Sequence, residues 1–407
     1  MRIDHDDCGA SRPDIVVIQD RTSPPVFRSP FSPAHPREQH AGGRLTIDLA
    51  ALAANWRKLN EIAVHAQCAA AIKGDGYGIG LERVGDALWK AGCGTFFVAL
   101  PDEGMRLREV LPGATIYVLN GLFRGAEADM REAKLIPVLG SPEEIEDWGR
   151  YARSLDRELP AALHIDTGMN RLGLTYEQAE AVSGLEMVEG IAPKLILSHL
   201  ACADTPDHPL NARQLERFEQ ARDLFPEVPA SLANSAGILN DPAYHFDLVR
   251  PGIALYGGAA RTDTANPMAP VVTLEARVLQ VRDVPAGDSV GYGAVESVGR
   301  PSRVAIVSVG YADGLLRAAG SRDGKPGAFG WIAGHKLSYV GRVSMDLIAL
   351  DVTDVPERIM HRGAWVELMG SHVGVDDLAR AAGTIGYEFL TDLSRRYARR
   401  YVGLDLA

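Results

Sequence analysis

Between residues 68 and 252, eight short apolar runs alternate with amphipathic stretches. The runs are rich in apolar residues, several of them β-branched or aromatic, as buried strands are. The stretches between them repeat apolar residues at every third and fourth position, as one face of a helix does. Strand–helix alternation of this kind predicts a parallel sheet. The runs span residues 68–73, 95–100, 115–120, 135–140, 162–167, 195–200, 231–235 and 246–252.

The number of repeats decides between the two common parallel folds. Eight repeats over about 200 residues are typical of a closed (β/α)8 TIM barrel. An open doubly wound sheet is the alternative, but it usually has fewer strands. The glycine-rich stretch "GDGYGIG" at residues 74–80 does not have the G-x-G-x-x-G spacing of a dinucleotide site. We therefore expect an α/β protein built on a barrel.

The pattern of apolar and polar residues changes after about residue 270. Segments such as "SRVAIVSVG" alternate apolar and polar residues between Gly, Pro and Asp turns, which predicts a mostly β C-terminal domain over 270–407. The barrel is expected over 43–269, and its first strand, about 44–49, is a candidate member of the β-rich domain. Residues 1–42 are rich in proline and polar residues and predict a flexible extension. Short closing helices are expected at 375–383 and 389–401.

Composition excludes several classes of protein. The formal net charge is −11, which argues against an electrostatic grip on nucleic acid. No apolar run is long enough to span a bilayer, and the charged start does not resemble a secretory signal. The four cysteines are scattered without C-x-x-C spacing, so neither a disulfide framework nor a zinc site is expected. No metal-binding motif was found, and a cytoplasmic protein is expected.

Unusual polar residues fall at one end of the expected barrel. Lys73, His199 and Arg250 end strands 1, 6 and 8, Asn234 and Ser235 end strand 7, and Arg171 follows strand 5. Each has an ordinary structural explanation when it is taken alone. In a TIM barrel, however, the carboxyl ends of all strands meet at the face that carries the chemistry. Together these residues predict an active site there.

The residue types indicate a cofactor. A lysine in apolar surroundings can lose its proton and form a Schiff base with a carbonyl. Ser235 and the backbone N–H groups of Gly252 and Ile253 follow strands 7 and 8, the usual phosphate site of this barrel. A Schiff-base lysine beside a phosphate site predicts pyridoxal 5′-phosphate, with Arg250 facing the ring nitrogen.

An ordered set of motifs gives a family resemblance. The chain contains "AIKGDGYGIG", "HIDTGMNRLG", "SHLACAD", "LANSAG", "VRPGIALYG", "VGYGA", "VGYADG", "GRVSMD" and "IGYEFL". From about residue 44 to 402 it resembles the alanine racemases, which are pyridoxal-phosphate enzymes with a barrel and a β domain. The resemblance implies interconversion of L-alanine and D-alanine by an obligate homodimer with shared active sites.

The resemblance also implies catalytic roles. Lys73 would hold the cofactor and exchange a proton on the D-face of the substrate, and Tyr292 of the partner subunit would take the α-proton of the L-enantiomer. Racemisation needs an acid and a base on opposite faces, and these two side chains, with reference pKa values of about 10, need neighbours that lower them. His199 would hydrogen-bond toward Tyr292 and Arg250. An arginine at the ring nitrogen stays protonated and limits side reactions.

The remaining implied roles concern binding. The cofactor would contact Tyr77, His199, Asn234, Ser235, Arg250, Gly252, Ile253 and Tyr387. Arg171 and the backbone at Met345 would hold the substrate carboxylate, while Tyr311 and Asp346 would form the outer layer at the substrate entrance.

The sequence departs from the family pattern at two positions. Ile79 replaces a usual histidine after the lysine, while Tyr77 is retained. His164 stands where many members carry a carbamylated lysine that orients the substrate-binding arginine. Histidine cannot form that carbamate, so a bound anion or His164 itself would have to position Arg171.

Three alternatives remain open from the sequence. A broad-specificity amino acid racemase would share nearly every motif and differ in pocket width. A pyridoxal-phosphate decarboxylase pairs a barrel with a β domain, but the chain lacks the "GGG" loop of that class. A single-domain cofactor carrier would lack the β domain and Tyr292. Whether D-alanine is supplied for peptidoglycan or broken down is also open.

Overall fold

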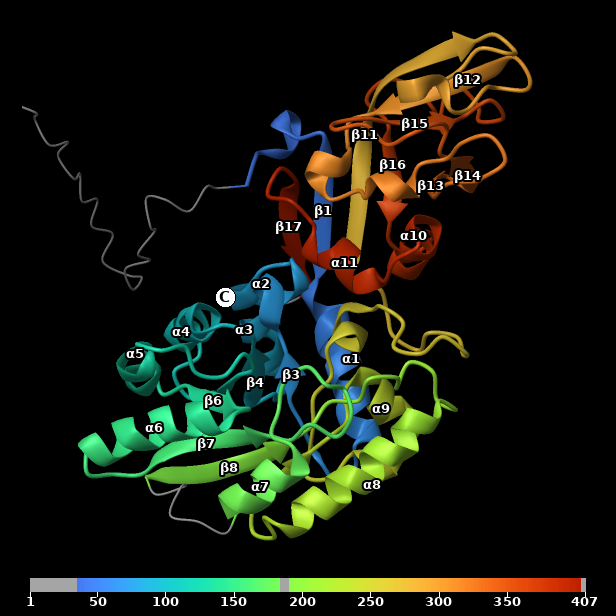
Figure 1. The fold of residues 1–407 in the computed structure, drawn as a ribbon. Coiled ribbons are helices and arrows are strands. Elements are labelled where there is room, and N and C mark those ends of the chain that lie inside the picture. Colours follow the sequence, from blue (N-terminus) through green and yellow to red (C-terminus); the bar gives the residue numbers. More distant parts are fainter. Residues whose placement is uncertain (1–34, 184–189, 404–407) are drawn as a thin grey trace, which may run out of the picture. The chain divides into compact units, whose positions relative to one another are not determined.

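The computed structural model describes residues 35–183 and 190–403. The expected flexible extension at 1–42 lies mostly outside the described residues, and its last part contains the short 3-10 helix η1 (Glu38–His40). Strands and helices alternate through the first part of the described chain, as Figure 1 shows.

The strands of the first part close into a barrel. β3 (Ala70–Ala71) begins a parallel series in which each strand pairs with the next along the chain. The series continues through β4 (Thr95–Val98), β5 (Thr115–Val118), β6 (Ile136–Leu139), β7 (Leu159–His164), β8 (Ile191–Leu197) and β9 (Ala230–Ser231). β10 (Leu248–Val249) pairs with β2 (Gln67–Cys68), which leads directly into β3.

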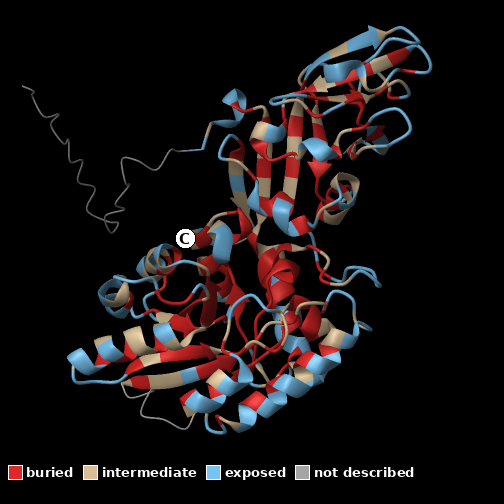
Figure 2. Ribbon diagram, viewed as in Figure 1, coloured by how far each residue is buried: buried red, intermediate tan, exposed pale blue. Residues whose placement is uncertain are grey.

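Backbone hydrogen bonds complete the ring. Asp247 N donates to Ala230 O at 3.0 Å, and Ala69 N donates to Val249 O at 3.0 Å. β10 therefore bridges β9 and the first strand, and the predicted (β/α)8 barrel is confirmed. Figure 2 shows that its strands are largely buried.

Amphipathic helices cover the barrel strands. Ser141 illustrates how they begin, since its hydroxyl caps α6 by accepting from Glu144 N at 3.2 Å, and Trp148 on the inner face is fully buried. The helices are α1 (Leu49–Ile62), α3 (Leu81–Ala91), α4 (Pro101–Val110), α5 (Glu127–Glu132), α6 (Pro142–Ser154), α7 (Tyr176–Ser183), α8 (Pro209–Asp223) and α9 (Ser235–Asn240). None of the helices among the described residues is long and apolar enough to cross a membrane.

The second part of the chain is mostly β, as predicted. Its strands are β11 (Val272–Val284), β12 (Ser302–Val307), β13 (Phe329–Ile332), β14 (His335–Ser338), β15 (Ile348–Asp351), β16 (Trp365–Met369) and β17 (Ala398–Val402). Two helices, α10 (Val375–Ala382) and α11 (Gly386–Thr391), lie between the last two strands. β1 (Gly43–Asp48) belongs to the same sheet, where it pairs antiparallel with β11 and parallel with β17.

One prediction for this domain is wrong for most of its length. Of the helix expected over 389–401, only residues 389–391 are helical, as the end of α11, and the chain then turns and forms β17. The physical reason is the free edge of β1. Residues 398–402 pair with residues 44–48 in register, and Tyr401 anchors the strand by donating its hydroxyl hydrogen to Ile79 O at 2.8 Å.

Candidate active site

A cavity of about 1280 Å³ lies at the carboxyl ends of the barrel strands. Its floor comes from the barrel and part of its wall from α10 and α11. Most of the predicted site residues line it, although they are far apart in the sequence. These are Lys73, Tyr77, Arg171, His199, Asn234, Ser235, Arg250, Gly252, Ile253 and Tyr387.

Lys73 follows β3 and begins a short turn, α2 (Lys73–Tyr77), that is left-handed at its centre. Its side chain is open to the cavity but has protein on its other sides. Burial lowers the pKa of the Lys73 ammonium, and the positive charge of Arg171 lowers it further, while Glu103 acts in the opposite direction. The shift is in the direction of the neutral amine that a nucleophile or general base requires.

Three tyrosines form a wall beside Lys73. Tyr77 stacks on Tyr256 with ring centroids 4.3 Å apart, and Tyr387 of α11 lies 5.9 Å from Tyr77 by the same measure. Burial raises the pKa of Tyr77, and burial also raises the pKa of Tyr387 to about 12. Both hydroxyls therefore stay protonated and can donate hydrogen bonds to an anion.

The ends of β9 and β10 form a concave patch of donors. Ser235 at the start of α9 accepts from Gly252 N at 2.8 Å and from Ala254 N at 3.3 Å. Asn234 caps α9, since its side-chain oxygen accepts from Gly237 N at 3.0 Å. The patch is tight, because a Cβ at Gly252 would lie 2.3 Å from the Tyr77 hydroxyl oxygen.

Arg250 is buried at the end of β10 and held by several acceptors. It donates to the Ser231 hydroxyl and, at 2.5 Å, to Ser198 O. A further contact joins Nη2 to His199 Nδ1 at 3.5 Å. Both terminal nitrogens are used in this way, and within residues 35–183 and 190–403 no partner engages Nε. Burial lowers the pKa of Arg250 to about 10, so the guanidinium remains charged at neutral pH.

The two histidines of the site are held neutral. Burial and then the charge of the neighbouring Arg250 lower the pKa of His164 to about 4. Burial and then Arg250 also hold the pKa of His199 well below its usual range. His164 ends β7 and does not line the cavity. A neutral His164 can accept a hydrogen bond from a cation, although the structure gives no direct bond between His164 and Arg171.

Besides His164, four predicted site residues do not line this cavity. Tyr292, in the 3-10 helix η5 (Tyr292–Ala294), is 71% exposed, and Met345 is 53% exposed. Tyr311, in η6 (Tyr311–Asp313), is 43% exposed, and its backbone N–H donates to Ser344 O at 3.0 Å. Asp346 pairs with Arg396 at 2.8 Å. Within one chain, these residues do not complete the site around Lys73.

Two contributors to the site were missed by the sequence analysis. Tyr256, in η4 (Ile253–Tyr256), supports Tyr77 and donates its hydroxyl hydrogen to Ala71 O at 3.1 Å. Glu103, in the first turn of α4, accepts backbone N–H groups from the turn after Lys73. The only signal for Glu103 was its place in a helix start, after Pro101, which predicts a cap and not a contact with the lysine turn.

The residues around the cavity fit pyridoxal phosphate. Amides and hydroxyls gather at Ser235 and Gly252, where the absence of a Cβ leaves the backbone open to an anion. Lys73 supplies the amine, and Arg250 supplies a donor for a ring nitrogen. The cavity also has room for a substrate beside the cofactor.

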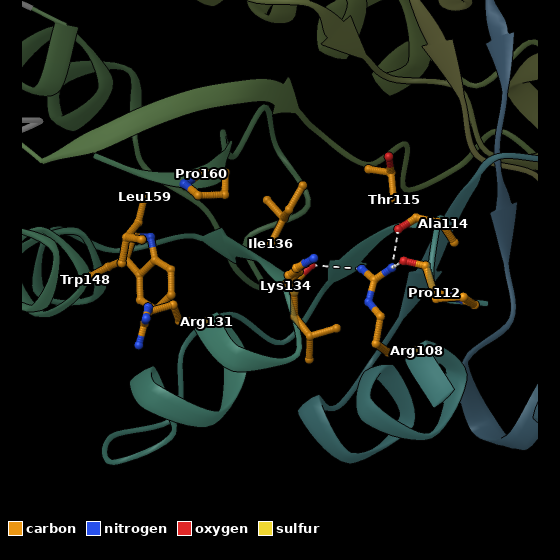
Figure 3. A pocket seen from close by; sticks show the side chains of 12 residues that line it. Arg108, Pro112, Ala114, Thr115, Arg131, Lys134, Ile136, Trp148, Leu159 and Pro160 are labelled. Atoms are coloured by element: carbon orange, nitrogen blue, oxygen red, sulfur yellow. Dashed lines mark hydrogen bonds between the residues drawn. The ribbon is translucent and has the colours of Figure 1, made fainter. Parts of the chain in front are cut away.

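A second cavity, of about 320 Å³, lies at the opposite end of the barrel (Figure 3). Arg108 lines this cavity, and its guanidinium is hydrogen-bonded to the backbone. It donates to the carbonyls of Ala114, Pro112 and Lys134 at 2.7, 3.0 and 2.9 Å. These bonds close the amino ends of neighbouring strands. We assign this cavity a structural role, as is usual for that face of a TIM barrel.

Comparison with known proteins identifies the same two parts of the chain. Residues 47–260 match the family model "Alanine racemase, N-terminal domain", and residues 271–401 match "Alanine racemase, C-terminal domain". The chain is 50% identical over 361 residues to an alanine racemase of Methylobacterium sp. (strain 4-46), with 89% of this chain and 98% of that protein covered. It is 48% identical over 370 residues to a biosynthetic alanine racemase of Agrobacterium fabrum, covering 89% and 94%.

A solved structure is similar over the same region. The crystal structure of alanine racemase from Bartonella henselae with covalently bound pyridoxal phosphate superposes with a TM-score of 0.83 at 39% identity. The superposition covers 89% of this chain and 100% of that one.

Proposed function

Because this chain belongs to the alanine racemase family, we propose that it interconverts L-alanine and D-alanine with pyridoxal 5′-phosphate as cofactor. The observation that carries the proposal is the cavity in which the Lys73 amine, Arg171 and a patch of phosphate donors face one space. When bound, the cofactor takes up the electron pair that remains after the α-proton leaves.

The chain's own residues have separate tasks in holding the cofactor. Ser235, Tyr77 and Tyr387 would donate hydroxyl hydrogens to the phosphate, and the amides of Gly252 and Ile253 lie beside them. Arg250 is held by Ser231 and Ser198, which would fix its guanidinium in one orientation when the cofactor is bound. A charged arginine beside the ring nitrogen would keep that nitrogen unprotonated and so favour racemisation over transamination.

Lys73 is the proposed base on the D-face of the substrate. It would accept the α-proton from D-alanine and return it, and the lowered pKa of its ammonium shifts the group in the direction that this exchange requires. Arg171 is the proposed partner of the substrate carboxylate. Its charge also depresses the pKa of Lys73, so it serves both binding and proton transfer.

The opposite face needs a second acid–base group, and we propose Tyr292 of the partner subunit. Tyr292 is exposed and lies outside the Lys73 cavity of its own chain, as Tyr311 and Met345 do. A symmetric homodimer would bring all three to the cavity of the other subunit. This arrangement gives each site one base from each chain.

The experiment that tests the function is chiral chromatography of the purified protein incubated with the cofactor and L-alanine, beside L-serine, L-lysine and L-arginine. We expect D-alanine to approach an equal mixture while the other amino acids react slowly. Comparable turnover of the larger substrates would instead show a broad-specificity racemase. Bound cofactor without any D-product would contradict racemase activity.

The cellular role depends on which alanine pool the protein meets. A racemase moves either enantiomer toward equal amounts, so one active site can supply D-alanine for peptidoglycan or feed its breakdown. We propose that the protein serves one of these two roles, and the similarity favours neither, since a biosynthetic and a catabolic alanine racemase of Agrobacterium fabrum are 48% and 47% identical to it. Deleting the gene distinguishes the two roles, since a supply role predicts growth that depends on added D-alanine.

A further inference from the structure

The turn after Lys73 has an unfavourable backbone conformation. Gly74, Asp75 and Gly76 have φ angles of 64°, 55° and 64°, and Tyr77 has 53°. Two of these four residues carry side chains, which rarely adopt left-handed geometry. Such a run persists only if surrounding groups hold it in place.

Glu103 supplies that support from α4. One of its carboxylate oxygens accepts from Gly74 N at 2.6 Å and Asp75 N at 3.1 Å. The other accepts from Ala99 N at 2.8 Å and Leu100 N at 3.2 Å. The side chain is only 8% exposed. A single buried carboxylate therefore ties the residues after Lys73 to the end of β4.

Arg106, one turn further along α4, strengthens the same connection. It donates to the Asp75 carboxylate at 2.9 Å and also pairs with Glu82. α4 therefore holds both the backbone and a side chain of the lysine turn. Arg106 is partly exposed, whereas Glu103 is buried and binds the amides nearest to Lys73. Glu103 is therefore the residue that we expect to fix the position of the lysine.

Glu103 also contributes a charge to the site. No arginine or lysine pairs with it within residues 35–183 and 190–403, and its negative charge acts on Lys73 against Arg171 and Arg250. His199 adds little charge because it stays neutral. The Glu103 carboxylate thus acts on both the backbone and the electrostatics of Lys73.

We propose that Glu103 is a positioning residue for the reaction, which fixes the direction of the Lys73 side chain by binding the amides of Gly74 and Asp75. The proposal rests on the proposed function for the role of Lys73. It does not require that Glu103 touch substrate or cofactor.

The decisive variant is Glu103→Gln. Glutamine has one acceptor oxygen, so its amide hydrogens would face two of the four N–H groups that Glu103 now binds. Asp102→Asn is the matched control. It removes the same charge from the same turn of α4, but Asp102 is exposed. Among the described residues, no hydrogen bond or ion pair joins Asp102 to the lysine turn.

The first readout uses cofactor-free protein and needs no turnover. Pyridoxal phosphate is added, the Schiff base is reduced with borohydride, and the yield at Lys73 is followed by peptide mapping over time. We expect Glu103→Gln to slow labelling of Lys73 by about 10-fold or more, since a displaced amine loses its favourable orientation. Asp102→Asn should label as the unchanged protein does.

The second readout separates positioning from general loss of stability. In the loaded protein, Glu103→Gln should change the visible circular dichroism of the bound cofactor and lower kcat with little change in KM for alanine. An unchanged labelling rate, dichroism and kcat would overturn the proposal. If the unchanged protein labels at Lys73 but racemises nothing, the proposed function fails while the Glu103 comparison still stands.

If Glu103→Gln does not fold, the proposal can still be tested on the unchanged protein. Hydrogen exchange resolved to single amides should show Gly74 and Asp75 strongly protected, because both donate to a buried carboxylate. Exchange at the rate of an open loop would contradict the proposal.

Discussion

The residues nearest to Lys73 give the site a positive character. Arg250 and Arg171 are cations, while His164 and His199 stay neutral because burial and Arg250 oppose their protonation. The site is therefore suited to two anions, a phosphate and a substrate carboxylate. Because these histidines resist protonation in the folded protein, they also lower its stability at acidic pH.

We predict that replacing His164 makes the free energy of unfolding less dependent on pH in the acidic range. The pKa of His164 is lowered to about 4 in the folded protein, from 6.5 in the unfolded chain. Between pH 4 and 6.5, His164 is protonated in the unfolded chain but neutral in the folded protein. Stability therefore rises with pH in this range and levels off above 6.5. In His164→Gln, the gain in unfolding free energy from pH 4.5 to 7 should shrink by about 2 kcal/mol.

Urea unfolding of cofactor-free protein at several pH values measures this effect. His65→Gln is the control, because His65 is exposed on the surface. A variant whose stability keeps the same dependence on pH as the unchanged protein would show that His164 titrates normally.

At the scale of elements, the site depends on a close approach between the ends of two barrel strands. α2 brings Tyr77 against Gly252 after β10, and Ser235 joins the same segment to α9. Glycine is required at residue 252 because the Tyr77 hydroxyl occupies the space that a Cβ would need.

We predict that Gly252→Ala weakens cofactor binding while the fold is retained. The added Cβ would lie 2.3 Å from the Tyr77 hydroxyl oxygen, so the tyrosine must move away from the place where we propose that it binds the phosphate. The dissociation constant of pyridoxal phosphate, measured by fluorescence titration, should rise by about 10-fold or more.

Gly299→Ala is the matched control, since a Cβ there meets nothing within 4 Å. Equal cofactor affinity in the two variants would contradict the tight contact between Tyr77 and Gly252.

The elements also show how far sequence reasoning extends. The barrel was predictable because its strands are buried on both faces and appear as continuous apolar runs. The rim residues were predictable because parallel strands all end at one face. Helix at 398–401 was wrong because pairing with β1 overrode local preference. The link from Glu103 to Gly74 was hidden because it joins residues 29 positions apart through side-chain and backbone atoms.

At the scale of the whole molecule, the proposed function divides the site residues of one chain between two places. Lys73 lines the large cavity, while Tyr292, Tyr311 and Met345 are exposed elsewhere. Exposed aromatic residues and methionine are enriched where proteins associate. Under the proposed function, this division of residues requires a dimer.

We predict that the protein sediments as a dimer and loses activity on dilution below its dissociation constant. Lys73→Ala and Tyr292→Phe should each sediment as the unchanged protein does and racemise alanine at a small fraction of its rate. A fully active monomer would contradict shared sites.

The most direct measurement of the central claim is complementation between these two inactive variants. They are co-expressed with different tags, the mixed dimers are purified, and racemisation of L-alanine is assayed. A mixed dimer contains one site with both Lys73 and Tyr292 of the partner subunit intact, so it should recover about half of the activity of the unchanged dimer. Mixed dimers as inactive as either parent would contradict a site built from two chains.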